Sequence, residues 1–378
     1  MAELHVDAIV LAAASWFEDY LVLDVLEECP APVLLWALPG IETGALCGTQ
    51  QATAFLKYLD CNVRCVYGQT EDSDCLGRAM AFLRAARLHS VLRRARVGLA
   101  GSRVNGMSHA SANEFALKKA VGARIVNLDM PDIIERVDAV GERDAGVVWD
   151  GIRNAAGCCK VPDTEGTRAA RFYLALREVA DQHGLNAMAV GCYPRLMGKI
   201  CLAASLLADE GLPLACEGDV HGALGQLILT LLTGQPTHNT DWLEPLADGT
   251  VVFTHCGSGS FSLAARKEDI VLGPVRLMNE GVCGLFPAKP GPVTLVSLVP
   301  HGDGYQCAVL EGEAVATEMV FPGNPAGVRF SLPADQLIEW IYAEGISHHW
   351  MIGYGHVAAE IREWASIAGP ALRLVEPE

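Results

Sequence analysis

Three titratable side chains stand on alternate positions in the stretch LPLACEGDVHGALGQLILTLLTG, residues 212–234. They are Glu217, Asp219 and His221, and they follow an apolar run and precede a helix-like run. A strand is therefore expected to end, and a helix to begin, at these residues. Ligands of open α/β sheets bind beyond the carboxyl ends of the strands, because loops and helix N-termini converge there. The pattern predicts a functional edge, although one acid at this place could simply cap the helix.

More residues of the same chemical types occur later in the chain. Asp241 follows the helix-like run in THNTDWLE, His255 ends a strand-like run in FTHCGSG, and His348 and His349 are adjacent. Carboxylates combined with imidazoles are typical ligands of Mn²⁺, Mg²⁺ or Co²⁺. Adjacent side chains of an extended segment point to opposite faces, so only one histidine of the pair is expected to face a given ligand. Each histidine alone fits a hydrogen-bonded structural role equally well, but the combined set favours a divalent metal site.

The composition favours an acidic protein that acts on small molecules. Apolar residues make up 51% of the 378 residues, enough for the cores of two or three domains. The formal charge of -17 and the pI near 5.1 disfavour nucleic acid and anionic lipid as partners, because both require basic patches. No run reaches the ~18 to 20 apolar residues of a membrane-spanning helix. The first residues lack the basic region of a signal peptide and are expected to form a strand, which indicates a cytoplasmic protein.

The thirteen cysteines do not form a recognisable framework. Many stand in apolar segments, where a free cysteine behaves as a small hydrophobic residue. Cys158 and Cys159 are adjacent and lack the CxxC spacing of a zinc site. We expect free thiols that pack in cores or lie at the surface.

The order of the predicted elements indicates an α/β fold. Strand-like and helix-like runs alternate over residues 1–95 and again over 96–234, which is typical of two Rossmann-like, doubly wound units. Over residues 235–378, short strand-like runs separated by Gly and Pro predict a mainly antiparallel β domain, followed by terminal helices. The functional residues therefore fall in the second and third of three predicted domains.

Several motifs of the chain resemble the L-fucose/L-arabinose isomerase superfamily, and more closely its L-fucose isomerase branch. These motifs are PVLLWALPG, GALCGTQQATAFLKYL, GSRVNGM, the segment from CYPRLMGK to THNTDW, HCG and SHHWMIGYG. The similarity extends over most of the chain and is strongest from 191 to 257. It implies two Rossmann-like domains, a C-terminal β domain and a divalent metal in a cleft between domains, most often Mn²⁺, with Co²⁺ or Mg²⁺ as alternatives.

The resemblance also implies roles for individual residues. Glu217 and Asp241 resemble the two carboxylate ligands of the metal, which also act as acid and base. His349 resembles the late histidine ligand, and His255 matches the histidine that arabinose isomerases add to the metal shell. Three further residues are expected to contact the substrate: Arg103, Asp219 and His348.

The implied reaction interconverts an aldose and a ketose through an ene-diol. One carboxylate would remove the proton next to the carbonyl, the other would transfer the hydroxyl proton, and the metal would stabilise the developing charge. The resemblance further implies a small sugar as substrate and a homo-oligomer with active sites near subunit interfaces. The chain is shorter than the family's members, which leaves the substrate's size and the assembly open.

Two other functions remain open at this stage. A sugar-binding or regulatory protein could keep the fold without catalysis, since fold does not fix function. A metal-dependent aldolase would use a similar ion but break a carbon–carbon bond. The stretch HCGSGSFSLAARK could bind an anionic substituent through backbone N–H groups, although an ordinary Gly/Ser-rich loop explains it as well.

Overall fold

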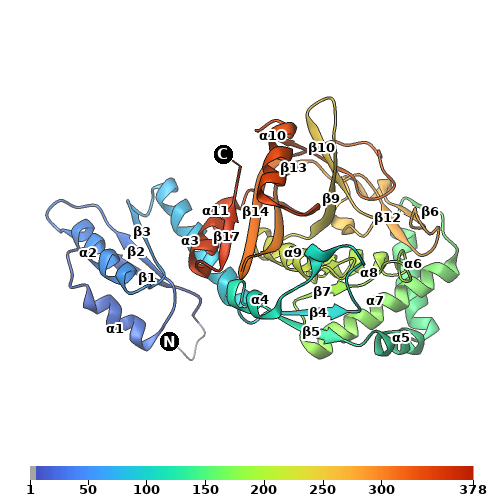
Figure 1. Cartoon of the computed structure of the whole chain (residues 1–378), viewed down its shortest axis with the longest axis horizontal. Coiled ribbons are helices and arrows are strands. Elements are labelled where there is room, and N and C mark those ends of the chain that lie inside the picture. The colour runs from blue at the N-terminus through green and yellow to red at the C-terminus, as the bar shows by residue number, and fades with distance from the viewer. Residues whose placement is uncertain (1–5, 378) are drawn as a thin grey trace. The chain divides into compact units, whose positions relative to one another are not determined.

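The computed structural model describes residues 6–377, which fall into two compact units (Figure 1). Unit 1 contains the chain up to Arg93 together with Ala359–Pro370. Unit 2 contains Arg94–Ala358 and the residues from Ala371 onward. All of the candidate site residues lie in unit 2.

Unit 1 is built on a parallel three-stranded sheet in the order β1-β2-β3. Its strands are β1 (Ile9–Ala13), β2 (Val33–Ala37) and β3 (Val63–Tyr67), and its helices are α1 (Tyr20–Glu28), α2 (Ala45–Tyr58), α3 (Ser73–Leu92) and most of α11 (Ala358–Ala368). Helix α3 begins after Asp72, whose carboxylate accepts the backbone N–H groups of residues 74 and 75. Ion pairs from Arg64 to Glu363 and from Arg84 to Glu360 join α11 to this unit.

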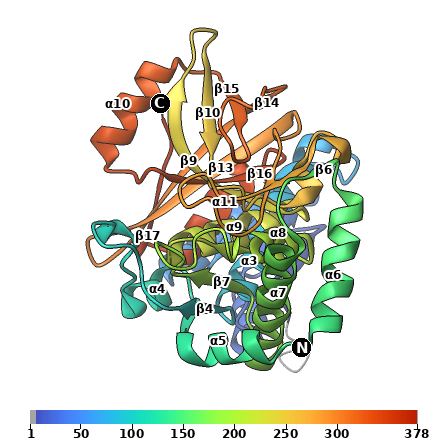
Figure 2. The same cartoon turned by 90° about the vertical axis from the view of Figure 1, so that its right-hand side faces the viewer.

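Unit 2 begins with a parallel four-stranded sheet in the order β5-β4-β7-β8. Its strands are β4 (Arg96–Ala100), β5 (Arg124–Leu128), β7 (Ala187–Val190) and β8 (Leu214–Ala215). Its helices are α4 (Glu114–Ala120), α5 (Met130–Ala139), α6 (Glu142–Ala155), α7 (Asp163–His183), α8 (Cys201–Asp209) and α9 (Val220–Thr233). Helix α7 contacts α5, α6 and α8, and Figure 2 shows α5, α6 and α7 as neighbouring green helices. The carboxyl edge of this sheet is where the ACEGD turn lies.

The rest of unit 2 is mainly antiparallel. Among the described residues, six strands close a barrel in the order β13-β16-β9-β10-β15-β14, because β13 also pairs with β14. These strands are β9 (Thr237–Pro245), β10 (Thr250–Thr254), β13 (Gly291–His301), β14 (Gly304–Val315), β15 (Ala326–Phe330) and β16 (His349–Tyr354). Strand β17 (Leu372–Val375) adds to β14 in parallel, and helix α10 (Ala334–Glu344) precedes β16. Closure leaves few exposed strand edges.

A small mixed sheet completes unit 2. It has the order β12-β11-β6 and consists of β6 (Cys158–Cys159), β11 (Val271–Gly273) and β12 (Cys283–Leu285). Cys158 and Cys159 therefore take part in ordinary strand pairing. All thirteen cysteines lie within the described residues, and all are free thiols.

Helix α9 joins the parallel sheet to the barrel. It contacts β4, β7 and β8 of the parallel sheet and β9, β13 and β16 of the barrel. Eleven of its fourteen residues are buried, as expected for a helix that is apolar on all sides. At Gly225 a Cβ atom would lie 2.9 Å from the side chain of Met351, so the missing side chain lets β16 approach. This packing fixes the N-terminus of α9 against the barrel strands that carry Asp241 and His349.

The predicted fold class is confirmed: α/β units with parallel sheets precede a mainly antiparallel β domain. The change of sheet type occurs between the end of α9 at Thr233 and the start of β9 at Thr237. The division into three domains at residues 95 and 234 stays a prediction. Within residues 6–377, no helix combines the length and apolar character needed to cross a membrane.

His238 on β9 makes the stability of the fold depend on pH. Its ring is buried, and neither nitrogen has a hydrogen-bond partner within the described part of the chain. Burial, assisted by the charge of Lys289, lowers the pKa of His238 to about 4. The unfolded chain takes up this proton near its ordinary pKa of ~6.5, so the folded state loses stability as the pH falls from there to about 4.

We expect His238→Gln to reduce this acid sensitivity. Between about pH 7 and about pH 5 the variant should lose about 2 kcal/mol less unfolding free energy than the parent, because glutamine cannot titrate. Urea unfolding at both pH values measures the difference. Identical losses in parent and variant would show that His238 is not held neutral by burial.

Candidate active site

The turn after β8 places Glu217 at the carboxyl edge of the parallel sheet. Glu217 has a φ of 64°, a left-handed conformation that is uncommon for a residue with a side chain. Gly218 follows with a φ of 68°, and a Cβ on it would lie 2.7 Å from the backbone of Ser102. The turn therefore needs glycine at 218, and it directs the Glu217 side chain toward β16, where Glu217 Oε2 lies 3.3 Å from His349 Nε2.

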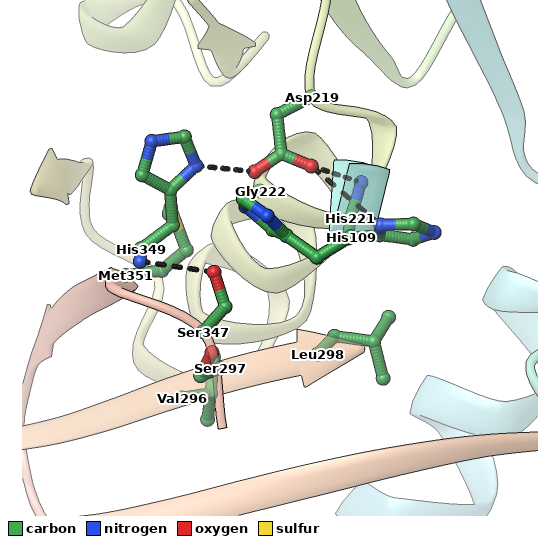
Figure 3. A pocket seen from close by; sticks show the side chains of 10 residues that line it. All are labelled: His109, Asp219, His221, Gly222, Val296, Ser297, Leu298, Ser347, His349 and Met351. Carbon is green, nitrogen blue, oxygen red and sulfur yellow. Dashed lines mark hydrogen bonds and ion pairs between the residues drawn. The ribbon is translucent and has the colours of Figure 1, made fainter. Parts of the chain in front are cut away.

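Asp219 caps α9 and holds His349. Its Oδ1 atom accepts the backbone N–H of His221 at 3.0 Å, and its Oδ2 atom lies 2.8 Å from His349 Nδ1 (Figure 3). Both side chains are 3% exposed. The hydrogen bond to His349 and the charges of His349 and His221 lower the pKa of Asp219 to about 2 despite its burial. In this hydrogen bond the Asp219 carboxylate therefore accepts and His349 Nδ1 donates. A histidine fixed in this way presents Nε2 for another contact.

This geometry changes the expected role of Asp219. Sequence analysis placed it among the substrate contacts, but its two oxygens bond to protein groups and the side chain is buried. Its position supports His349 instead. His221, the third residue of the opening pattern, lies 3.1 Å from the hydroxyl of Tyr305 through Nε2 and joins α9 to β14.

Asp241 and His349 face each other on neighbouring strands. They are register partners of β9 and β16, and Asp241 Oδ1 lies 3.4 Å from His349 Nε2. Asp241 also pairs with Thr254, the last residue of β10, which brings His255 to the same end of the barrel. The rings of His255 and His349 have centroids 6.0 Å apart. The structure thus brings together Glu217, Asp241, His255 and His349, although Glu217 and His349 are 132 residues apart in the sequence.

Three of these side chains are placed to share a divalent cation, and Asp241 lies next to His349. Glu217, His255 and His349 each offer a ligand atom within 4.8 Å of the other two. Three buried atoms at this place have no hydrogen-bond partner within residues 6–377: His349 Nε2, Asp241 Oδ1 and His255 Nδ1. Two carboxylates and two imidazoles match the preferences of Mn²⁺ or Co²⁺, and the oxygen donors also suit Mg²⁺.

The electrostatics of the site also favour a cation. Burial alone would lower the pKa of His349, but the neighbouring carboxylates of Asp219, Glu217 and Asp241 raise it to about 10. Burial likewise opposes charge on His255, yet Cys256 and Asp241 raise its pKa to about 9. The pocket therefore stabilises positive charge on buried groups, as a metal site with an excess of carboxylates would.

His348 does not follow the alternation expected for an extended segment. The rings of His348 and His349 lie 4.3 Å apart, and both approach Asp241, at 3.9 Å and 3.4 Å. The expectation that the two histidines face opposite sides is wrong. Strand β16 begins at His349, so His348 belongs to a bend in which alternation does not apply.

His109 is a site residue that the sequence analysis missed. It lies in a short 3₁₀ turn, Ser108–Ala110, in the segment that follows β4 at the carboxyl edge of the sheet. Its ring centroid is 5.1 Å from that of His348 and 5.9 Å from that of His349. The available signal was its position after a parallel strand, in the same segment as the GSRVNGM motif.

Arg103, the remaining predicted substrate contact, lies in the segment that follows β4. Arg103 Nε donates to Ser111 Oγ at 2.5 Å and Nη1 donates to the carbonyl of Val104 at 3.1 Å. Its backbone nitrogen would be 2.8 Å from a Cβ on Gly218, so its segment touches the ACEGD turn. A substrate contact by Arg103 stays a prediction.

In the Gly/Ser-rich stretch after His255, hydrogen-bond donors are bonded to other parts of the protein. The N–H of Gly259 donates to Asn324 Oδ1 at 2.7 Å, and the hydroxyl of Ser260 donates to Asp209 at 2.5 Å. Because these groups already have partners, the loop interpretation fits better than anion binding.

The role of Asp219 can be tested by Asp219→Asn. Asparagine is an equally good helix cap, but the metal-free protein should lose stability because the buried, protonated His349 loses its carboxylate partner. The loss of the negative charge next to His349 Nδ1 should weaken Mn²⁺ binding by about 10 to 100-fold. Calorimetric titration of metal-free parent and variant measures this, and an unchanged dissociation constant would remove Asp219 from the site.

Comparisons with known proteins bear on the activity. No protein-family model matches the chain. The chain is 24% identical over 375 residues to a sulfoquinovose isomerase from Priestia megaterium, covering 95% of this chain and 83% of that protein. It is 26% identical over 347 residues to a sulfoquinovose isomerase from a Clostridium species, covering 87% and 77%. It is also 26% identical over 343 residues to the L-arabinose isomerase of Acidothermus cellulolyticus, covering 82% and 66%.

These similarities cover between 82% and 95% of the chain. They do not test the closer relation to the fucose isomerase branch, which stays a prediction. Similarity over most of its length to several such enzymes shows that this chain is an isomerase enzyme.

Proposed function

We propose that the enzyme interconverts an aldose and a ketose through an ene-diol at the site formed by Glu217, Asp241, His255 and His349. The observation that carries the proposal is the position of the two carboxylates. They come from separate elements, the turn after β8 and strand β9, and lie 3.3 Å and 3.4 Å from the same nitrogen, His349 Nε2. A reaction that moves two protons on adjacent carbons and oxygens needs two such groups.

Glu217 and Asp241 would perform the proton transfers. One carboxylate removes the proton from the carbon next to the carbonyl, and the other carries a proton between the two sugar oxygens. Side-chain exposures of 18% for Glu217 and 28% for Asp241 leave both accessible to a substrate, whereas the side chain of His349 is 3% exposed. Glu217, Asp241, His349 and His255 would hold a divalent metal, whose charge polarises the carbonyl and stabilises the ene-diolate.

The relatives suggest which sugars to test first. They are named for sulfoquinovose and for L-arabinose, so we propose these two sugars and L-fucose as the first substrates. No observation on the site favours a carbon–carbon cleavage over proton transfer.

The test is product analysis by NMR. Protein loaded with Mn²⁺ is incubated with each sugar, and we expect at least one to approach an equilibrium mixture of aldose and ketose. Products with fewer carbons would indicate an aldolase. Saturable binding of a sugar without conversion, in metal-loaded protein, would favour the non-catalytic binding protein.

A further inference from the structure

Three imidazoles meet beside the carboxylate site. The ring nitrogens of His109, His348 and His349 offer ligand atoms within 4.8 Å of one another. His349 begins β16, His348 lies in the bend just before it, and His109 comes from the turn after β4. Figure 3 shows His109 and His349 lining the same small cavity next to Asp219. This group is separate from the set of Glu217, His255 and His349, except that both contain His349.

The nitrogens of this group are available to a ligand. His109 Nε2 and His349 Nε2 are buried, and neither has a hydrogen-bond partner among the residues that the structure describes. His349 Nδ1 is already bonded to Asp219 at 2.8 Å. Any cation that uses His349, in either group, must therefore bind the same atom, Nε2.

The two groups differ in the ions they prefer. Three imidazoles suit Zn²⁺, which takes nitrogen ligands at about 2.0 to 2.1 Å in nearly tetrahedral sites. Carboxylates suit Mn²⁺ and Mg²⁺, and an imidazole site generally binds Mn²⁺ much more weakly than Zn²⁺. Two nitrogens on one tetrahedral Zn²⁺ lie about 3.4 Å apart, so the rings need to close by about 1.5 Å or less.

We propose that His109, His348 and His349 form a second metal position that takes Zn²⁺ and excludes the ion at the carboxylate position, because both positions require His349 Nε2. Zn²⁺ then competes with Mn²⁺ although the two ions lie at different places. If the proposed function is correct, Zn²⁺ should also inhibit turnover. The existence of two mutually exclusive metal positions does not rest on the proposed function.

The experiment measures binding, without sugar. Metal-free protein is titrated with Zn²⁺ and, separately, with Mn²⁺ by calorimetry, for the parent, His109→Gln, His348→Gln and Glu217→Gln. His356→Gln, at an exposed histidine of the barrel, is the matched control. We expect both site histidine variants to weaken Zn²⁺ binding by at least ~10-fold and to change Mn²⁺ binding by less than about 2-fold, each lost ligand acting on its own position. Glu217→Gln should do the reverse.

A competition experiment tests the shared ligand. Electron paramagnetic resonance detects free Mn²⁺, so addition of one equivalent of Zn²⁺ to the Mn²⁺-loaded parent should release Mn²⁺, and His109→Gln should need at least ~10-fold more Zn²⁺. Retention of Mn²⁺ with Zn²⁺ bound to the same protein would overturn the proposal, as would Zn²⁺ affinities in both histidine variants equal to the control. If the binding results hold while no sugar is converted, only the proposed function fails.

Discussion

Glu217→Gln and Asp241→Asn should each reduce turnover by at least ~10² to 10⁴-fold, the range for loss of general acid or base catalysis. Each substitution keeps the size of the side chain but removes a charge and a proton acceptor. Both groups lie within 3.4 Å of His349 Nε2, so metal affinity should fall as well. Steady-state kinetics at saturating metal separates the loss of catalysis from the loss of binding.

Glu244→Gln is the matched control for these variants. Glu244 is an exposed carboxylate on β9, three residues after Asp241, and its replacement should leave turnover unchanged. If Glu217→Gln and Asp241→Asn convert a sugar as fast as the control, these residues are not the acid and base.

Removal of the metal should abolish turnover, and Mn²⁺, or Co²⁺ or Mg²⁺, should restore it. The buried orphan atoms His349 Nε2, Asp241 Oδ1 and His255 Nδ1 would regain a common partner when the ion binds. Because a ligand of the folded state adds stability by mass action, Mn²⁺ at about 100 times its dissociation constant should add about 2.7 kcal/mol. Thermal unfolding with and without Mn²⁺ measures this, and His349→Ala should largely lose the increase.

The metal content of active protein decides this prediction. Full activity in protein that elemental analysis shows to be metal-free would exclude a catalytic ion. Thermal unfolding with and without Mn²⁺ requires no substrate, so it tests metal binding before the sugar is identified.

Local sequence patterns predicted the elements that carry the site. The apolar run LPLAC, the glycine after Glu217 and the helix-like run after Asp219 each have a direct structural meaning: β8, a left-handed turn and α9. The change from long helices to short strands after Gly234 likewise reports the change from a parallel sheet to a barrel. Strands, turns and helices of this kind depend on residues that are neighbours in the sequence, so one sequence is enough to predict them.

Features that depend on distant segments could not be predicted in this way. The barrel closes only because β13 pairs with β14 as well as with β16. The role of Asp219 depends on a contact with His349, 130 residues away. His109 lies in an irregular turn, where no sequence periodicity predicts the direction of a side chain. His348 lies just before β16, so the alternation of side chains along a strand does not describe it.

The most direct test of the ene-diol mechanism is deuterium incorporation in D₂O. Mn²⁺-loaded protein is incubated with a sugar that it converts, and NMR follows the carbon next to the carbonyl. If Glu217 or Asp241 removes that proton, deuterium should appear at this carbon in parent reactions, and Glu217→Gln and Asp241→Asn should slow its appearance by at least ~10²-fold. Conversion without any deuterium at this carbon in the product would instead indicate transfer of hydrogen within the substrate, and would contradict the account.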